Sequence, residues 1–334
     1  MLVLAFLIAT PELGLEGGVS CGVCHLDPVG GGLRAGPGFG IGVRKIPFAP
    51  RQDYVPPYLN EEETITYGGD MRLFYARNSD RLSSYSLMQG DIYIGDALNE
   101  RVYVYVDKGI WGGAEVAGYI WNLLLSGSYI KAGFFKPPFG LRTDDHQSYA
   151  SRAGPVGPRS SDAGLEIGYN SEWLTISFAH QNGAPGAIFD SDTFRTVSAR
   201  AMVFLRHLMF GGSFYKKMDR NYYGLSLGFS GFNFYPWADA VLVNSPYDST
   251  YTLDLTAFLY WKPRRGFYPF FAYDLTQEYL RGTNITEIGE RQRVGVRFIP
   301  MPFTEIYGAY GLVKHKGGKS YEDNEATLSL HFYY

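Results

Sequence analysis

Long apolar runs are what this sequence most clearly lacks. Apart from Met1–Ala9 (MLVLAFLIA), no stretch approaches the roughly 20 apolar residues that a membrane-spanning helix requires. Charge is also scarce, because only 19% of the 334 residues are Asp, Glu, Lys or Arg and the net charge is −3. A balance this close to neutral does not suggest a nucleic-acid-binding surface. The composition therefore favours neither a helical membrane protein nor a partner of nucleic acids.

Aromatic residues and glycine are abundant instead. The chain holds 27 Tyr, 23 Phe and 41 Gly. A membrane β-barrel uses both kinds of residue, because aromatic girdles lie at the two membrane interfaces and glycine serves turns and narrow lumen positions. Mean hydropathy is slightly negative, which fits strands that are apolar on one face only.

The N-terminal segment resembles a signal for export. Met1–Ala9 has the length of a signal-peptide apolar region, although no Lys or Arg precedes Arg34 and the usual basic flank is missing. We assign residues 1–18 to this signal-like segment, with cleavage expected somewhere between about residues 10 and 20. Export places the remainder of the chain in an oxidising compartment.

Both cysteines of the chain belong to one motif, Cys21-Gly22-Val23-Cys24-His25. Two thiols at this spacing can add to the vinyl groups of one porphyrin, and the adjacent His25 then serves as proximal ligand of the haem iron. The motif therefore predicts one covalent haem c. A redox dithiol, a disulfide and half of a zinc site are the alternatives, although no second cysteine pair is present to complete a zinc site.

Glycine and proline dominate the sequence that follows the motif. Leu26–Arg34 reads LDPVGGGLR, and GPGFG and PFAP follow before residue 51. We predict a short irregular haem-binding arm over residues 19–60, which is too small to bury a porphyrin without help from the rest of the chain. Arg34 is a candidate partner for a haem propionate.

The sixth ligand of the iron is not apparent near the motif. His146 lies in a large loop, and His331 lies on the expected lumen face of the last strand. We take His146 as the first candidate for the distal ligand and His331 as the second. The alternatives are a methionine (Met71, Met88 or Met202) and a water molecule at an open sixth position.

From Thr64 onward the sequence alternates in polarity with a period of two residues. The segment Tyr251–Trp261 is the clearest case, because Leu253, Leu255 and Leu259 alternate with polar residues such as Asp254 and Thr256. Counting such segments predicts an all-β fold, a transmembrane antiparallel β-barrel of about 16 strands over residues 61–334. The last strand ends with outward Leu328, Leu330, Phe332 and Tyr334, similar to the C-terminal signal of outer-membrane proteins.

Connections between the predicted strands alternate between short and long. Short turns such as 170–172 and 206–208 are typical of the periplasmic end of a barrel, and longer segments such as 181–192 and 314–324 of the external end. The largest loop, 141–163, holds the position of the third external loop of a sixteen-stranded porin. We expect it to fold inward and constrict the lumen or meet the haem arm; the alternative is a solvated external loop.

Two family resemblances follow from these residues. The segment Ala132–Leu141 (AGFFKPPFGL) resembles a segment of the phosphate-selective porins of the O and P type. The whole plan, one Cys-x-x-Cys-His arm followed by a sixteen-stranded barrel, resembles the fused monohaem cytochrome–porin proteins of iron-oxidising and metal-reducing bacteria. This resemblance implies electron exchange across the outer membrane of a Gram-negative bacterium, with Cys21, Cys24 and His25 holding the cofactor.

The expected function is therefore electron transfer between the periplasm and an extracellular donor or acceptor such as iron. The expected partners are outer-membrane lipid, a periplasmic c-type cytochrome, and an extracellular metal or multihaem cytochrome. Two alternatives stay open: a diffusion porin for small anions with a haem-bearing plug, for which Arg200, Arg293 and Arg297 suit the lumen, and a sheath around a separate multihaem cytochrome. No motif for hydrolysis is apparent, so any enzymatic activity is expected to be that of an oxidoreductase.

Overall fold

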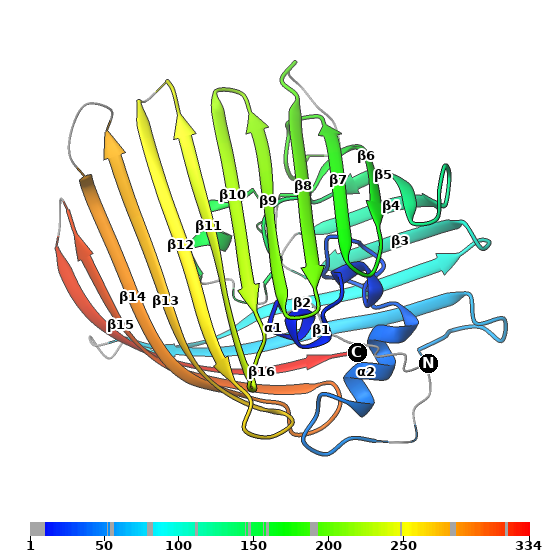
Figure 1. The fold of residues 1–334 in the computed structure, drawn as a ribbon, viewed down its shortest axis with the longest axis horizontal. Helices are drawn as coiled ribbons and strands as arrows, with labels where there is room; N and C mark the ends of the chain where they lie inside the picture. The colour runs from blue at the N-terminus through cyan, green and yellow to red at the C-terminus, as the bar shows by residue number, and fades with distance from the viewer. Residues whose placement is uncertain are drawn as a thin grey trace.

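The computed structural model describes residues 11–51, 53, 57–78, 83–110, 113–143, 145, 148–155, 157, 160–187, 193–247, 249–280, 285–317 and 320–334. In these residues, sixteen antiparallel strands close into a barrel (Figure 1). Each strand pairs with its neighbours in the sequence, and β16 closes the barrel on β1, where Leu73 lies opposite Leu330. The predicted fold class is confirmed.

The strands are β1 Ile65–Arg77, β2 Ser83–Ala97, β3 Val102–Gly109, β4 Ala114–Trp121, β5 Ser128–Phe135, β6 Asp162–Asn170, β7 Leu174–Gln181, β8 Thr196–Leu205, β9 Leu208–Lys217, β10 Arg220–Phe229, β11 Phe234–Ser245, β12 Thr250–Trp261, β13 Phe267–Leu280, β14 Ile285–Phe298, β15 Thr304–Lys316 and β16 Tyr321–Tyr333. The helices are α1 Pro11–Gly17, the 3-10 turn η1 Cys21–Val23, α2 Gly36–Arg44 and α3 Tyr149–Ala153. Over the described ranges, no helix is both long and apolar enough to cross a membrane.

The two faces of each strand differ in polarity as the sequence predicts. In β12, the side chains of Asp254, Thr256 and Phe258 are buried in the lumen, whereas Leu259 and Trp261 are exposed on the outer wall. Large apolar side chains are exposed on the other strands too, for example Ile92, Val104, Leu225, Leu227, Val294 and Leu328. A closed sheet with an apolar exterior pairs its backbone groups within the sheet and leaves apolar side chains for the hydrocarbon of a bilayer.

The two ends of the barrel have different connections. One end, called the short-turn end below, has brief turns such as 171–173, 206–207 and 230–233; the opposite, long-loop end has the segments 136–161 and 182–195. Other connections at the long-loop end are shorter than predicted. The expected loop 314–324 is only 317–320, because β15 and β16 continue to pair as far as His315 and Tyr321.

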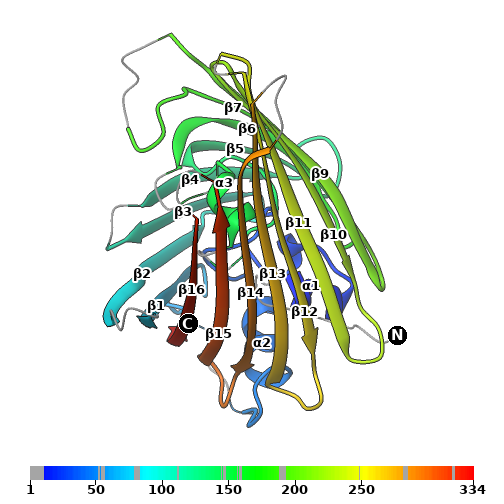
Figure 2. The ribbon, with the colours of Figure 1, turned by 90° about the vertical axis from the view of Figure 1, so that its left-hand side faces the viewer.

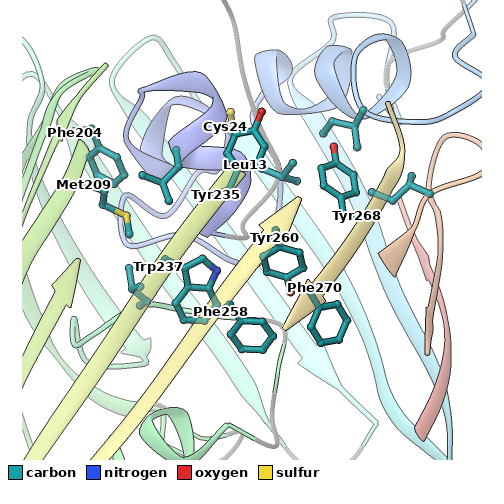
Figure 3. Packing of buried hydrophobic residues seen from close by; sticks show 14 of the residues in the cluster. Leu13, Cys24, Phe204, Met209, Tyr235, Trp237, Phe258, Tyr260, Tyr268 and Phe270 are labelled. Carbon is teal, nitrogen blue, oxygen red and sulfur yellow. The ribbon is translucent and has the colours of Figure 1, made fainter. Parts of the chain in front are cut away.

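Helix α1 lies inside the barrel at the short-turn end, and the arm that follows it continues to α2 at the mouth of that end (Figures 1 and 2). Leu13 and Leu15 of α1 are buried in the cluster shown in Figure 3, where Leu13 lies close to Tyr235. Ion pairs of Glu12 with Arg297 and of Glu16 with Lys262 hold the helix to the wall. Residues 1–10 of the predicted signal-like segment lie outside the described residues, whereas residues 11–17 form this lumen helix.

The arm was predicted to be irregular throughout, but its residues Gly36–Arg44 form helix α2. Pro37 occupies the first turn of the helix, where its missing N–H is not needed. A Cβ atom on Gly38 would lie 2.3 Å from the carbonyl oxygen of Cys24. Glycine is therefore required where the helix crosses the cysteine motif, and the low helix propensity of this segment is overridden by packing.

The loop after β5 folds into the lumen. Its helix α3 contacts β11, β12 and β13 on the far side of the barrel. The backbone N–H of Tyr149 donates to Asp274 Oδ1 at 3.2 Å, and the N–H of Ala150 donates to Thr256 Oγ1 at 3.2 Å. The prediction of an inward-folded third loop is confirmed, and the alternative of a purely solvated loop is wrong.

Candidate cofactor site

The cysteine motif forms a tight turn against the barrel wall. The N–H groups of Cys24 and His25 both donate to the carbonyl oxygen of Cys21, at 3.1 and 3.0 Å. Ser20, just before the turn, donates from its hydroxyl to the carbonyl oxygen of Ser171 at 2.6 Å. A Cβ atom on Gly22 would clash with the side chain of Asn170. The β6–β7 turn therefore fixes the start of the motif.

A short hairpin follows the motif and returns the chain to it. Residues His25 and Arg34 form an antiparallel bridge, and the N–H of Leu26 donates to the carbonyl oxygen of Leu33 at 3.1 Å. The turn of this hairpin contains Gly30–Gly32, whose φ angles are 97°, 85° and 62°. Residues that have a side chain rarely adopt such positive φ angles, which explains why three glycines follow one another here. The hairpin brings Arg34 beside His25.

The two thiols are not joined by a disulfide. Cys24 is buried in the hydrophobic cluster that also contains Leu13, and Cys21 packs against this cluster. Burial raises the pKa of the Cys21 thiol above its ordinary value, although the cations Arg200 and Arg142 oppose the shift. A reactive dithiol needs a lowered thiol pKa, so this environment does not favour the redox-dithiol interpretation.

His25, Arg34 and His331 line one cavity of about 360 Å³ in the lumen. Other parts of its wall come from Tyr93 and Tyr105 of the barrel. Both ring nitrogens of His331 are engaged, Nε2 with Asp70 Oδ1 at 2.8 Å and Nδ1 with Arg72 at 3.1 Å. The cavity thus brings together the predicted proximal ligand, the second candidate for the distal ligand and the predicted propionate partner.

The residues around this cavity suit a haem in their chemistry. Two thiols without a disulfide stand next to a buried imidazole, and Arg34 lies on the same cavity wall with its guanidinium 4.8 Å from the ring centre of Tyr333. The cysteine side chains do not border the cavity, but hydrogen bonds close His25 and both cysteines into one turn. The donor set therefore suits the predicted cofactor in its chemistry, and the cavity borders its imidazole and its arginine but not its thiols.

Asp27, two residues after His25, anchors the motif to both the wall and the loop. Its Oδ2 accepts hydrogen bonds from Lys131 Nζ of β5 and from Arg142 Nη1 of the inward loop, each at 3.0 Å. Arg142 Nη1 also donates to the carbonyl oxygen of Gly30 at 2.8 Å. We call Asp27, Lys131 and Arg142 the Asp27 clasp. It joins the arm, the wall and the loop at one carboxylate.

The Asp27 clasp is deeply buried. Burial opposes the charged form of Asp27, but the cations Lys131 and Arg142 outweigh this effect and hold the pKa of the carboxyl below its usual range. Lys131 also lies 3.7 Å from Glu166, which accepts a 2.6 Å hydrogen bond from the hydroxyl of Tyr129. Buried charges persist when they are paired in this way, so the clasp requires all of its members.

The lumen arginines predicted from the sequence are buried and have protein partners. Arg293 contacts Asp274 at 2.9 Å and Asp145 at 2.7 Å. Arg297 pairs with Glu305 at 2.5 Å, and the Nε of Arg200 donates to the carbonyl oxygen of Gly140 at 2.8 Å. Carboxylates of the wall, the arm and the loop thus balance the charges of Arg293 and Arg297.

His146, the first candidate for the distal ligand, lies outside the described residues. Among the residues that the structure does describe, no group of three or more His, Cys, Asp or Glu side chains could hold a metal ion.

The sequence predicted the position of His331 on the lumen face, which the structure confirms, but it did not predict the Asp27 clasp. Lys131 and Arg142 are 104 and 115 residues away from Asp27 in the chain. The available signal was a lysine in the middle of the lumen face of β5, since a buried lysine requires a carboxylate partner.

Comparisons with known proteins establish the fold. No family model and no curated protein matches the sequence. Solved structures do match, and those described below are an outer membrane protein, an outer membrane channel and an anion-selective porin. Together with the apolar outer wall, this likeness shows that the chain has the fold of the porin-type β-barrels of the outer membrane.

Three of these structures illustrate the likeness. OmpT of Vibrio cholerae, in a form that lacks loop L8, has a TM-score of 0.63 and 8% identity, over 81% of this chain and 99% of that one. The outer membrane channel DcaP of Acinetobacter baumannii has a TM-score of 0.61 and 11% identity, over 84% and 100%. An anion-selective porin from Comamonas acidovorans has a TM-score of 0.60 and 10% identity, over 81% and 99%.

Proposed function

We propose that this porin-type barrel is an outer-membrane haem protein that passes electrons between the periplasm and the cell exterior. Cys21 and Cys24 would hold one haem c through thioether bonds, and His25 would ligate its iron. The observation that carries the proposal is the position of the cysteine motif. It is folded inside the barrel, with His25 on the wall of a cavity that also contains Arg34 and His331.

Bound at this site, a haem would supply one-electron redox chemistry. The chain itself would orient it. Arg34 offers a cation to a propionate, and the barrel wall keeps the ring away from lipid. His331 is the candidate for the sixth ligand that the structure describes, with His146 and water as alternatives. Its Nε2–H donates to Asp70 and its Nδ1 accepts from Arg72. One of these two contacts would have to be released for its nitrogen to bind iron, and the other would then orient the ring.

A periplasmic partner would complete the route. Short turns mark the periplasmic end of such barrels, so α2 lies at the periplasmic mouth. Arg44, Lys45 and Arg51 are exposed there, and residues 36–51 contain no Asp or Glu. This basic surface suits an acidic region of a c-type cytochrome. A single haem covers only part of a hydrocarbon core roughly 30 Å thick, so it cannot carry electrons across the whole membrane by itself. An extracellular metal or multihaem cytochrome would therefore exchange electrons at the long-loop end.

A diffusion porin for small anions with a haem-bearing plug is the second candidate, favoured by the likeness to outer-membrane channels. A sheath around a separate multihaem cytochrome is not favoured, because the arm and the inward loop already enter the lumen.

Electron transfer across proteoliposomes tests the proposal. The purified protein is inserted into vesicles that contain an oxidised soluble cytochrome c, and dithionite is added outside. We expect reduction of the enclosed cytochrome with the wild-type chain and its loss with the double variant Cys21→Ala/Cys24→Ala. Equal reduction with both chains would mean that dithionite diffuses through the lumen, and would favour the porin alternative.

A further inference from the structure

The outer wall of the barrel has a groove near the short-turn end. The groove, of about 680 Å³, lies over β9 to β13, which Figure 1 shows side by side. Small side chains form its floor, namely Pro236 and Ala238 of β11 and Ala257 of β12. Ala238 and Ala257 lie directly opposite each other in the sheet, so the floor is two strands wide at this level. We call it the Ala238 groove.

Large apolar side chains border the floor on both sides. In the sheet, Ala238 lies opposite Leu227 of β10. On the other side, Ala257 lies opposite Tyr273 of β13. Further rings that line the groove are exposed on the outer wall: Phe210, Phe229 and Phe271. Because these side chains stand above the floor, the groove suits a slender chain and excludes the convex wall of a second barrel.

The Ala238 groove faces the half of the membrane next to the short turns. Strand β11 begins at Phe234, only two residues before Pro236. Strand β12 ends at Trp261, only two residues after Leu259, which also lines the groove. Short turns mark the periplasmic end of such barrels, so the slender apolar molecule available here is an acyl chain of the periplasmic leaflet. Acyl chains are as apolar as the wall, so a preference for one lipid must come from packing and from its headgroup.

Exposed cations lie where the headgroup of such a lipid would lie. The turn 262–266, which follows the floor strand β12, contains Arg264 and Arg265, and both are exposed. Lys262 of the same turn is already paired with Glu16 of the arm. Neither this turn nor the turn before β11 contains an Asp or Glu. A phosphate beside the turn would therefore meet two arginines, and no carboxylate of these turns would oppose it.

We propose that the Ala238 groove binds an anionic phospholipid of the periplasmic leaflet. An acyl chain would lie over Pro236, Ala238 and Ala257, and the phosphate would lie at Arg264 and Arg265. The floor would select a hydrocarbon chain by its shape, and the turn would select a negative headgroup by its charge. The site lies on the outer wall, so its occupation does not depend on a haem in the lumen.

Native mass spectrometry of the full-length barrel, released from detergent with added lipid, tests the proposal. We expect one phosphatidylglycerol to be held more tightly than phosphatidylethanolamine, whose headgroup has no net charge. The variant Arg264→Gln/Arg265→Gln should weaken phosphatidylglycerol binding about tenfold or more, because each arginine near an anionic headgroup strengthens its binding severalfold. Arg195→Gln/Arg220→Gln, the same change of charge at the long-loop end, should bind as the wild type does.

A second pair of variants tests the floor. Ala238→Phe/Ala257→Phe fills the groove and should abolish the tight binding, whereas Ala132→Phe on the exposed face of β5 should not. Electrophoresis without heating checks that each barrel is folded. Equal binding of the two lipids to the wild type would reveal an ordinary lipid annulus and overturn the proposal. Barrel dimers that Ala238→Phe/Ala257→Phe separates would assign the groove to a second copy of the chain and would overturn it as well.

Discussion

Asp27 illustrates how a single carboxylate organises the lumen. It is fully surrounded by protein, yet its pKa lies below the ordinary value because Lys131 and Arg142 overcome the cost of burial. A carboxyl with a lowered pKa stabilises the folded state at every pH above its unfolded value of about 3.9, and this contribution is lost only as the pH falls through the folded value. Asp27 therefore stays charged at physiological pH and keeps its ion pairs with Lys131 and Arg142.

Replacing Asp27 with Asn should release the arm. The change leaves two buried cations without their shared anion, and breaking a buried pair typically costs about 3–5 kcal/mol. We expect faster amide hydrogen exchange across residues 19–51, measured by mass spectrometry at neutral pH. Asp53→Asn is the control, because Asp53 is exposed on the same arm.

The pH dependence of the same exchange provides a second check. After correction for the intrinsic exchange rate, protection of the arm in the wild type should be constant between about pH 5 and pH 8, since Asp27 stays charged throughout. A loss of protection near pH 6 would contradict the lowered pKa of Asp27 and point to a histidine instead.

At the scale of elements, α2 depends on a close approach to the cysteine turn. Gly38 leaves no room for a Cβ atom beside the carbonyl oxygen of Cys24, whereas a Cβ on Gly36 would meet no atom within 4 Å. Both glycines lie in the first turn of the same helix, so they form a matched pair for substitution.

Gly38→Ala should displace α2 from the cysteine turn, and Gly36→Ala should not. We expect Gly38→Ala to destabilise the arm by about 1–3 kcal/mol, in the range for overpacking, and to speed proteolysis of residues 36–51. Gly36→Ala should be neutral or stabilising by up to about 1 kcal/mol. Equal proteolysis of the two variants would contradict the contact between α2 and Cys24.

Strands could be predicted because their polarity alternates with a period of two residues. Elements that are held by contacts between residues far apart in the sequence could not. The alternation in Tyr251–Trp261 predicts β12 because one face of the strand meets water-filled or protein-filled lumen and the other meets lipid. The helix α2 was missed because local glycine and proline content contradicts it. Its stability comes from Cys24 and the barrel, which no local pattern encodes.

At the scale of the whole molecule, the arm and the inward loop occupy the barrel from opposite ends. The Asp27 clasp joins them, while Tyr149 and Ala150 tie the loop to the far wall. The sequence predicted the inward loop, and it offered a plug in the lumen as one alternative for the arm. It did not predict that one carboxylate connects the two, since that contact spans 115 residues. Such a lumen should conduct ions poorly.

Removal of the arm should therefore open the barrel. In planar bilayers, the wild type should show a small single-channel conductance, and a chain that lacks residues 11–51 should show one several times larger. The variant Asp27→Asn should fluctuate between the two levels. A wild-type conductance equal to that of the shortened chain would show that the arm does not obstruct the lumen.

The most direct test of the central claim is the absorbance spectrum of the purified outer-membrane protein, oxidised and dithionite-reduced, with haem quantified as the pyridine haemochrome. We predict one c-type haem per chain, lost in Cys21→Ala/Cys24→Ala. A six-coordinate spectrum that becomes high-spin in His331→Ala would identify the sixth ligand. A protein without haem, purified from cells able to attach haem to other c-type cytochromes, would contradict the claim and leave a porin with a cysteine-bearing arm in its lumen.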